Sequence, residues 1–321
     1  MHAYRVLGRS EKLLDDLSVD PERNLVTDYR IVVHLDLDEA LAVKPDLVFV
    51  CNPSNLHARV ALQAAKAGAH IFIEKPVADT LDGLEELLAL VRAKQLVCYV
   101  GYNFRFHPAL IRLKELLEAR NFGNLLAVQL EIGEYLPNWH RYEDYRTMYA
   151  SRADLGGGVI LSQIHEMDLI YWYFGLPVSI YCVGGKLSCL EIDVEDTATS
   201  LMQYRGALGN FPITLHQDYL QRPPVRTLKI VGDQGIAQID LIKGTLMVYS
   251  AEGDVIEQWD GSNFKRNDMF LAQMRHFLAC VADEAFPQVS LWDGMQSMRL
   301  ALAAKQSLAS QALVQLQEFA P

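Results

Sequence analysis

Short apolar runs alternate with amphipathic helical segments through the first hundred residues of this chain. The apolar runs have the length of strands and lack polar alternation, which is typical of strands buried on both faces of a parallel sheet. Gly68 follows a helical segment, where a left-handed residue commonly ends a helix. This alternation predicts a doubly wound α/β domain. The predicted strands are residues 3–8, 30–35, 47–51, 69–74 and 96–102, and the predicted helices are residues 10–17, 36–41, 56–67 and 80–94.

The pattern changes after about residue 105, because several strands then follow one another without intervening helices. Such a succession predicts an open, mostly antiparallel sheet. We therefore expect a Rossmann-like domain over residues 1–104 and a second α/β domain over residues 105–321. The second domain is expected to contain helices at 108–120, 159–174, 268–282 and 292–311, and strands at 125–132, 180–184, 198–204, 209–216, 227–231, 236–240 and 245–249.

Composition excludes several classes of protein. The net charge of -11 and the pI of about 5.3 argue against nucleic acid or an anionic membrane as a partner. The five cysteines have neither metal-site nor redox-motif spacing, which favours reduced, buried thiols. No window approaches 18 uninterrupted apolar residues, and the amino terminus has no apolar signal core. We therefore expect a soluble, cytoplasmic protein.

Residues 71–76, with the sequence Ile-Phe-Ile-Glu-Lys-Pro, place a charged pair at the end of a predicted strand. Pro76 lacks a backbone donor and holds Lys75 extended, so the strand must end here. Ligands of open α/β sheets bind at this carboxyl edge. The alternative is a helix-start segment in which Glu74 and Lys75 are simply solvated.

The two neighbouring strands bring further polar residues to the same predicted edge. Asn52 and His57 flank the turn after the strand at 47–51, where a helix N-terminus can stabilise negative charge. Asn103 and Arg105 follow the next strand along the sheet. The alternatives are a capping turn in the first case and ordinary linker chemistry in the second.

The apolar helix predicted over 159–174 carries Ser162, His165 and Asp168 at intervals of three residues, which places them along one stripe. A polar stripe on an apolar helix indicates a cavity wall, and His165 can exchange a proton near neutral pH. The alternative is a structural histidine bonded to a neighbouring strand. A metal site is disfavoured, because the second histidine of the H-E-x-x-H pattern is missing.

The loop over 135–149 contains aromatic rings, including Trp139, beside His140 and two arginines. Aromatic faces combined with hydrogen-bond donors suit a sugar or another polyhydroxyl ligand. They suit a subunit interface almost equally well.

A Gly-rich G-x-G-x-x-G turn is absent from the sequence. A dinucleotide-binding fold normally opens with this turn and reads the ribose with an acidic residue about 20 residues later. Gly156 and Gly158 follow a charged loop rather than a strand, so we do not expect them to cradle a phosphate. Either this is another kind of α/β domain, or its first βα unit is absent.

Together these segments resemble the Gfo/Idh/MocA family of NAD(P)-dependent oxidoreductases. The family implies a Rossmann domain followed by an α/β domain whose open sheet forms the substrate face and often an oligomer interface, so we expect a homo-oligomer. The loop from Tyr135 to His140 also resembles a subgroup of surface-sugar pathways. The ordered motifs are Asn52-Pro53-x-x-x-His57, Glu74-Lys75-Pro76, Gly101-Tyr102-Asn103-x-Arg105-Phe106, Gly156-Gly157-Gly158 before His165-x-x-Asp168, and Asp293-Gly294 before a long helix.

The resemblance also implies roles for single residues. Lys75 would contact the nicotinamide ribose and stabilise alkoxide charge on the reacting hydroxyl, and His165 would be the general acid/base. The Lys75–Pro76 bond is a candidate cis bond. Asn52, Pro53, His57, Glu74, Lys75 and Asn103 would line the nicotinamide, and the candidate substrate contacts are Lys75, Arg105, Trp139, His140, Ser162, His165 and Asp168.

Two departures from the family pattern affect these expectations. The family has an aspartate one turn before the histidine, and its role is here lost or taken by Asp168 or Glu166. Arg9 and Ser10 stand where the adenosine ribose is read, and the lack of an acidic residue favours NADP over NAD. Because a central strand and the pyrophosphate site are missing, we expect the chain as given to bind cofactor poorly or to misfold, and a longer reading frame to correct this.

The leading hypothesis is an oxidoreductase that moves a hydride between a nicotinamide cofactor and a hydroxyl or carbonyl carbon of a sugar or sugar derivative. One alternative is a ligand- or cofactor-binding protein without turnover, which the two departures favour. Another is a reductase of a non-sugar carbonyl or imine.

Overall fold

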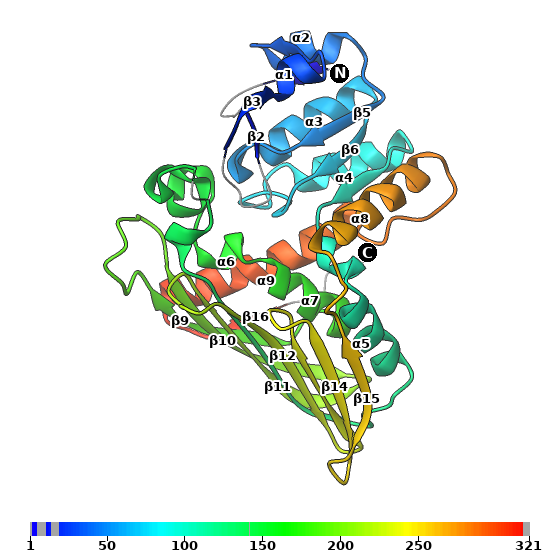
Figure 1. Cartoon of the computed structure of the whole chain (residues 1–321), viewed down its shortest axis with the longest axis vertical. Helices are drawn as coiled ribbons and strands as arrows, with labels where there is room; N and C mark the ends of the chain where they lie inside the picture. The colour runs from blue at the N-terminus through cyan, green and yellow to red at the C-terminus, as the bar shows by residue number, and fades with distance from the viewer. Residues whose placement is uncertain (1, 5–10, 14–18, 141, 317–321) are drawn as a thin grey trace.

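The computed structural model describes residues 2–4, 11–13, 19–140 and 142–316. A set of parallel strands with flanking helices stands over one face of a broad curved sheet (Figure 1). Helices α7 (His165–Phe174) and α9 (Leu291–Ser310) lie between these two layers. This arrangement confirms the predicted fold class, an α/β structure with one parallel sheet and one mostly antiparallel sheet.

The amino-terminal layer contains a three-stranded parallel sheet in the order β5-β6-β7. Strand β7 and all but the first residue of β6 are buried, as expected for strands covered on both faces. Gly68 ends α3 with a left-handed φ of 88°, as predicted. The elements of this sheet and its helices are α2 (Leu37–Ala42), β5 (Leu47–Val50), α3 (His57–Ala67), β6 (His70–Ile73), α4 (Leu84–Ala93) and β7 (Cys98–Val100).

A second parallel pair, β1 (His2–Tyr4) with β4 (Val32–His34), is separate from this sheet. Within the described residues no strand joins the two. Apolar side chains near the break are exposed: Leu35 by 88% and Phe49 by 47%.

The helix predicted over residues 10–17 is wrong in its described part. Glu11–Leu13 form strand β2, which pairs antiparallel with β3 (Val19–Asn24) ahead of the short helix α1 (Leu25–Asp28). A helix of that length has little stability unless a face packs against other elements, so pairing with a nearby strand is favoured instead.

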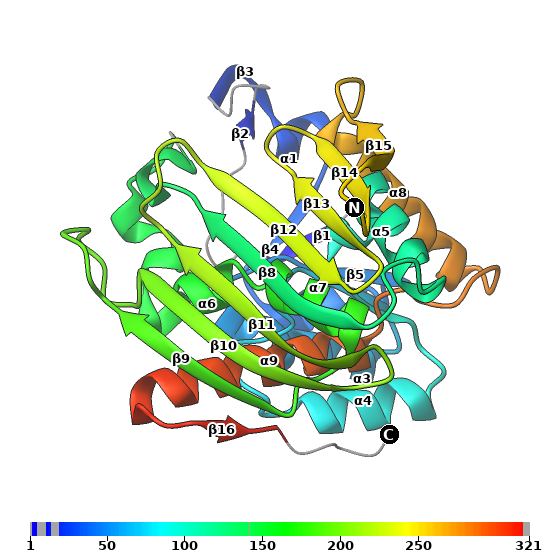
Figure 2. The ribbon, with the colours of Figure 1, turned by 90° about the horizontal axis from the view of Figure 1, so that it is seen from below.

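The large sheet has nine strands in the order β15-β14-β13-β12-β8-β11-β10-β9-β16. Only β8 and β11 pair in parallel. Helices cover one face, and no described helix covers the other (Figure 2). Helix α5 (Pro108–Glu118) is joined to this sheet through the Arg112–Glu257 pair, whereas α8 (Arg266–Val281) packs Phe277 against Phe72 and Tyr99 of the parallel sheet. The strands are β8 (Leu125–Gly133), β9 (Ser179–Gly185), β10 (Thr197–Gly206), β11 (Gly209–Asp218), β12 (Val225–Gly232), β13 (Gly235–Asp240), β14 (Thr245–Ser250), β15 (Val255–Asp260) and β16 (Val314–Gln315).

The edge strands β15 and β16 were not predicted. Strand β15 is largely exposed, and β16 has only two residues. A strand paired on one side and open to solvent needs no buried face, so its sequence carries little apolar signal.

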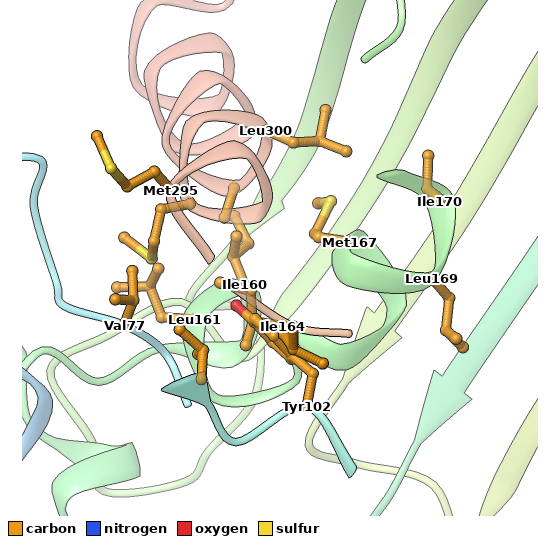
Figure 3. Packing of buried hydrophobic residues seen from close by; sticks show 14 of the residues in the cluster. Val77, Tyr102, Ile160, Leu161, Ile164, Met167, Leu169, Ile170, Met295 and Leu300 are labelled. Atoms are coloured by element: carbon orange, nitrogen blue, oxygen red, sulfur yellow. The ribbon is translucent and has the colours of Figure 1, made fainter. Parts of the chain in front are cut away.

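The predicted helix over 159–174 is interrupted. It forms α6 (Val159–Ser162) and α7, with Gln163 and Ile164 between them. Tertiary hydrogen bonds replace the helical ones, because Gln217 Nε2 donates to Gln163 O at 3.0 Å and Gln163 Nε2 donates to Asp218 O at 2.9 Å. Apolar residues of both short helices gather around α9, where Met295 and Leu300 are buried with them (Figure 3).

A buried ion pair joins α7 to the 3-10 turn η2 (Asn103–Phe106). Arg105 Nε and Nη2 donate to the two carboxylate oxygens of Asp168 at 2.9 and 2.7 Å, and the side chains are 3% and 1% exposed. Ser297 of α9 donates to the same carboxylate at 2.9 Å, and Arg105 Nη1 also donates to Gln288 O. These bonds tie α7 and α9 to the end of the parallel sheet.

We expect Asp168→Asn to destabilise the protein by about 3–5 kcal/mol, because it leaves the buried Arg105 charge with only the longer, 3.5 Å contact to Asp293. Urea unfolding followed by circular dichroism measures this loss.

The matched control is Glu257→Gln, which removes the same kind of carboxylate from a bidentate but solvent-accessible pair with Arg112. That change should cost less than about 1 kcal/mol. Equal losses for the two variants would contradict the structural role of the buried pair.

Candidate active site

The three parallel strands end together, so their following turns meet at one edge. The register pairs Val50 with Ile73 and Ile73 with Val100. The turns that carry Asn52, Lys75 and Asn103 therefore leave the sheet side by side. The turns after β6 and β7 approach so closely that a Cβ on Gly101 would lie 3.1 Å from Glu74 Oε2. This is the ligand-binding edge that the sequence predicts.

A cavity of about 650 Å³ lies between this edge and the large sheet. It includes the amino end of α7, part of the aromatic loop and the segment between β11 and β12. Of the predicted site residues, those that line it are Glu74, Lys75, Asn103, Trp139, His140, Ser162 and His165.

Lys75 reaches across the cavity to the end of α6. Its Nζ donates to Ser162 O at 2.9 Å. This bond holds the ammonium in the cavity, next to the carboxyl end of the parallel strands. An ammonium has three donors, and no other partner for Lys75 is found among the described residues. Two donors are therefore free for a ligand. The Lys75–Pro76 bond is cis, as the family resemblance implies.

His165 opens α7 and is largely enclosed. Its ring lies 4.7 Å from the ring of Phe104 and meets Tyr102 edge-on at 5.9 Å. Burial, and then the positive charges of Lys75, Arg226 and Arg266, hold the pKa of His165 well below its usual value. The imidazole is therefore neutral at physiological pH and can accept a proton.

Neither carboxylate next to His165 orients its ring. Glu166 accepts from Arg226 Nε at 2.6 Å and from Nη2 at 3.0 Å, and Asp168 accepts from Arg105. Within the described chain, His165 Nδ1 is buried without a hydrogen-bond partner. Of the two alternatives for the family's aspartate, these contacts agree with the loss of its role and not with its replacement by Asp168 or Glu166.

Arg105 and Asp168 do not line the cavity. Both side chains are buried in the ion pair with each other, so their geometry does not support the predicted substrate contacts. Asp168 lies on α7 with His165, but its carboxylate accepts hydrogen bonds from Arg105 and from Ser297 of α9.

Asn52, Pro53 and His57 stand beside the cavity without lining it. The two ring nitrogens of His57 lie 2.7 Å from Pro76 O and 2.6 Å from Asn52 O. This histidine therefore ties the turn after β5 to the turn that carries Lys75. Arg9 and Ser10, the candidate ribose-reading residues, lie outside the described residues.

Several buried polar atoms of the cavity wall lack a partner in the described part of the chain. They include Asn103 Oδ1, Trp139 Nε1, Gln163 Oε1 and His165 Nδ1. Buried polar groups are nearly always hydrogen-bonded in folded proteins, so atoms left open around one cavity indicate a place where a polar ligand binds.

Sequence analysis missed three arginines of the cavity: Arg222, Arg226 and Arg266. Arg222 precedes Pro223-Pro224, a sequence that indicates a rigid loop between strands. Arg226 pairs with Glu166, which lies 60 positions earlier in the sequence. Arg266 begins helix α8, far along the sequence from the other site residues. Long-range contacts of this kind leave no local signal.

The described residues include no helix long and apolar enough to cross a membrane. They also bring together no group of three histidine, cysteine or carboxylate side chains with the geometry of a metal site.

Two family descriptions match this chain. Residues 7–102 match the oxidoreductase family with an NAD-binding Rossmann fold, and residues 110–238 match the GFO/IDH/MocA C-terminal domain. The oxidoreductase YrbE of Bacillus subtilis is 28% identical over 89% of this chain and 80% of its own length. Myo-inositol 2-dehydrogenase of Thermotoga maritima is 27% identical over 85% of this chain and 80% of its own length.

Among solved structures, the fold is similar to that of the WlbA dehydrogenase from Bordetella pertussis, crystallised with NADH and UDP-GlcNAcA. The TM-score is 0.76 at 19% identity, over 92% of this chain and 86% of that one. This likeness concerns the fold. With both family descriptions matching in order along the sequence, the chain belongs to the GFO/IDH/MocA family of oxidoreductases.

Proposed function

We propose that this protein is an NAD(H)-dependent oxidoreductase that acts on a hydroxyl or carbonyl carbon of a sugar or related cyclic polyol. The observation that carries the proposal is that the Lys75 ammonium and the neutral His165 imidazole line one cavity at the edge of the parallel sheet. A relative named myo-inositol 2-dehydrogenase supports a polyhydroxyl substrate. The aromatic loop, with Trp139 in the cavity wall, supports the same class.

The nicotinamide end of the cofactor fits the residues present. Asn103 offers an unpartnered amide oxygen, and Glu74 and Lys75 lie at the same strand edge. When bound there, the cofactor supplies or accepts the hydride. The pyrophosphate end has no Gly-rich turn in this sequence, so weak cofactor binding stays a prediction that calorimetry with NADH tests. The preference for NADP rests on Arg9 and Ser10 and likewise stays a prediction.

Lys75 and His165 divide the proton and charge chemistry between them. In the direction of oxidation, His165 accepts the hydroxyl proton, because its low pKa keeps the ring unprotonated. Lys75 directs its free donors at the same oxygen and stabilises the alkoxide charge that develops. Its bond to Ser162 O holds this position before substrate arrives, so no reorganisation is needed.

Two alternatives keep a specific basis. A binding protein without turnover is favoured by the unpartnered Nδ1 of His165, because no carboxylate fixes its tautomer. A reductase of a non-sugar carbonyl or imine would use the same Lys75 and His165 pair. A nicotinamide absorbance assay over a panel of sugars, polyols and non-sugar carbonyls separates the three.

The domain division at residues 104 and 105, the homo-oligomer and the cytoplasmic location are part of this proposal. The uncovered face of the nine-stranded sheet supports an interface between copies. Sedimentation velocity measures the oligomeric state directly.

We expect Lys75→Ala to lower kcat roughly 100-fold to 1000-fold, because a preorganised charge opposite the alkoxide is lost. The melting temperature should change little. Initial rates of nicotinamide absorbance measure the effect. Lys66→Ala is the control, because Lys66 is an exposed lysine paired only on the surface with Glu86. Full activity of Lys75→Ala would refute the assigned role.

We expect the His165 ring to stay neutral well below pH 6.5, because burial and three cations lower its pKa. Histidine ring signals in an NMR pH titration report this directly, and His165→Gln identifies the signal by its loss. A midpoint for that signal at or above about 6.5 would contradict the role of His165 as a neutral base.

A further inference from the structure

The cavity carries more positive than negative side chains, although the whole chain has a net charge of -11. Lys75, Arg222, Arg226 and Arg266 line it, together with two carboxylates, Glu74 and Glu134. Arg226 is neutralised by its bidentate pair with Glu166. Burial raises the pKa of Glu74, which weakens its negative charge. Among the described residues that line the cavity, Glu134 is then the remaining carboxylate opposite Lys75, Arg222 and Arg266.

Arg222 and Arg266 form no hydrogen bond or ion pair with any described residue, and both meet an aromatic ring instead. The guanidinium carbon of Arg222 lies 4.0 Å from the ring centre of Tyr135, and that of Arg266 lies 5.9 Å from the ring centre of Phe270. Stacking on a ring holds the plane of a guanidinium while its N–H groups stay free at the edge. Those edges match the two oxygens of a carboxylate or phosphate.

The chain around Arg222 is fixed before any ligand binds. Gln221 donates to Glu131 at 2.9 Å and to Asp218 at 2.7 Å, which anchors the residue before Arg222. Two prolines follow it and restrict the backbone. The backbone at Arg222 therefore needs little further ordering when the arginine binds an anion.

Arg266 is the first residue of the 16-residue helix α8, whose amino end has no side-chain cap. Arg266 and His165 line the same cavity, and the Arg266 charge contributes to the lowered pKa of that ring. The positive end of the helix dipole adds to the same potential.

We propose that the substrate of this site carries an anionic group, a carboxylate or a phosphate, which Arg222 and Arg266 bind at the mouth of the cavity while Lys75 and His165 face the reacting carbon. This rests on the proposed function for the identity of the reacting carbon, but the recognition of an anion does not depend on turnover. Both arginines are exposed at the cavity, so a neutral sugar would leave their guanidinium groups to water, whereas an anionic group would give them charge-assisted hydrogen bonds.

The test is a binding measurement that needs no turnover. Calorimetry at low ionic strength compares D-glucuronate with D-glucose, and D-galacturonate with D-galactose, with and without NADH. Uridine diphosphate serves as the phosphate probe. We expect at least one anionic probe to bind roughly tenfold or more tightly than its neutral counterpart or than uridine, since charge-assisted hydrogen bonds are the stronger ones.

Variants locate the effect. Arg222→Gln and Arg266→Gln should each weaken binding of that anionic probe roughly tenfold and leave neutral probes and NADH unchanged. Arg222→Lys, which keeps the charge but loses the planar fork, should fall between Arg222→Gln and the parent. The control is Arg205→Gln, because Arg205 is an exposed arginine on β10 outside the cavity.

Each outcome decides the inference. If a uronate shows this dependence, the group is a carboxylate, and if only uridine diphosphate does, the group is a phosphate. Equal binding of charged and neutral probes, or anion binding that both Gln variants retain, would overturn the inference. Arginine-dependent binding without hydride transfer would sink the proposed function and keep the inference, whereas turnover of neutral sugars by both Gln variants would do the reverse.

Discussion

The buried pair of Arg105 and Asp168 is the constraint on which the site depends. Arg105 lies two residues after Asn103, and Asp168 lies one helical turn after His165. By joining η2 to α7, the pair fixes the strand edge and the opposite wall of the cavity relative to each other. Because such pairs gain little net stability over apolar packing, its value here is in geometry. Arg105 and Asp168, which the sequence predicts as substrate contacts, thus hold Asn103 and His165 in place at the cavity.

The same wall of the cavity shows how charge is distributed around the proposed base. Both carboxylates adjacent in sequence to His165 are committed to arginines, one on β12 and one on η2. Neither carboxylate is then available to His165 Nδ1, and burial together with the charges of Lys75, Arg226 and Arg266 lowers the pKa of the ring. A ring of this kind is a weaker base than one paired with an aspartate, but it is unprotonated over a wider range of pH.

Local sequence signals were sufficient for the parallel sheet and its edge. The structure at the apolar runs, at Gly68 and at Lys75-Pro76 is determined by residues close by in the sequence. These local signals were therefore enough to predict that Asn52, Lys75 and Asn103 meet at one edge. The break at Gln163 and the partners of Glu166 and Asp168 depend on bonds to β11, β12 and η2. These contacts join residues 55 or more positions apart, so they leave no local signal in the sequence. Helical periodicity alone therefore predicted one continuous helix with a polar stripe, whereas the helix is interrupted at Gln163.

The cations of the cavity link substrate recognition to proton transfer. Arg266 contributes to the low pKa of His165 while its charge is unbalanced. An anionic substrate group bound to Arg266 would cancel part of this field and raise the pKa of His165 toward its ordinary value. Proton affinity at the imidazole then increases when substrate is present, which is when a hydroxyl proton must be accepted. The arginine that would bind the anionic substrate would in this way also set the pKa of His165, although no carboxylate of the described residues is bonded to that ring.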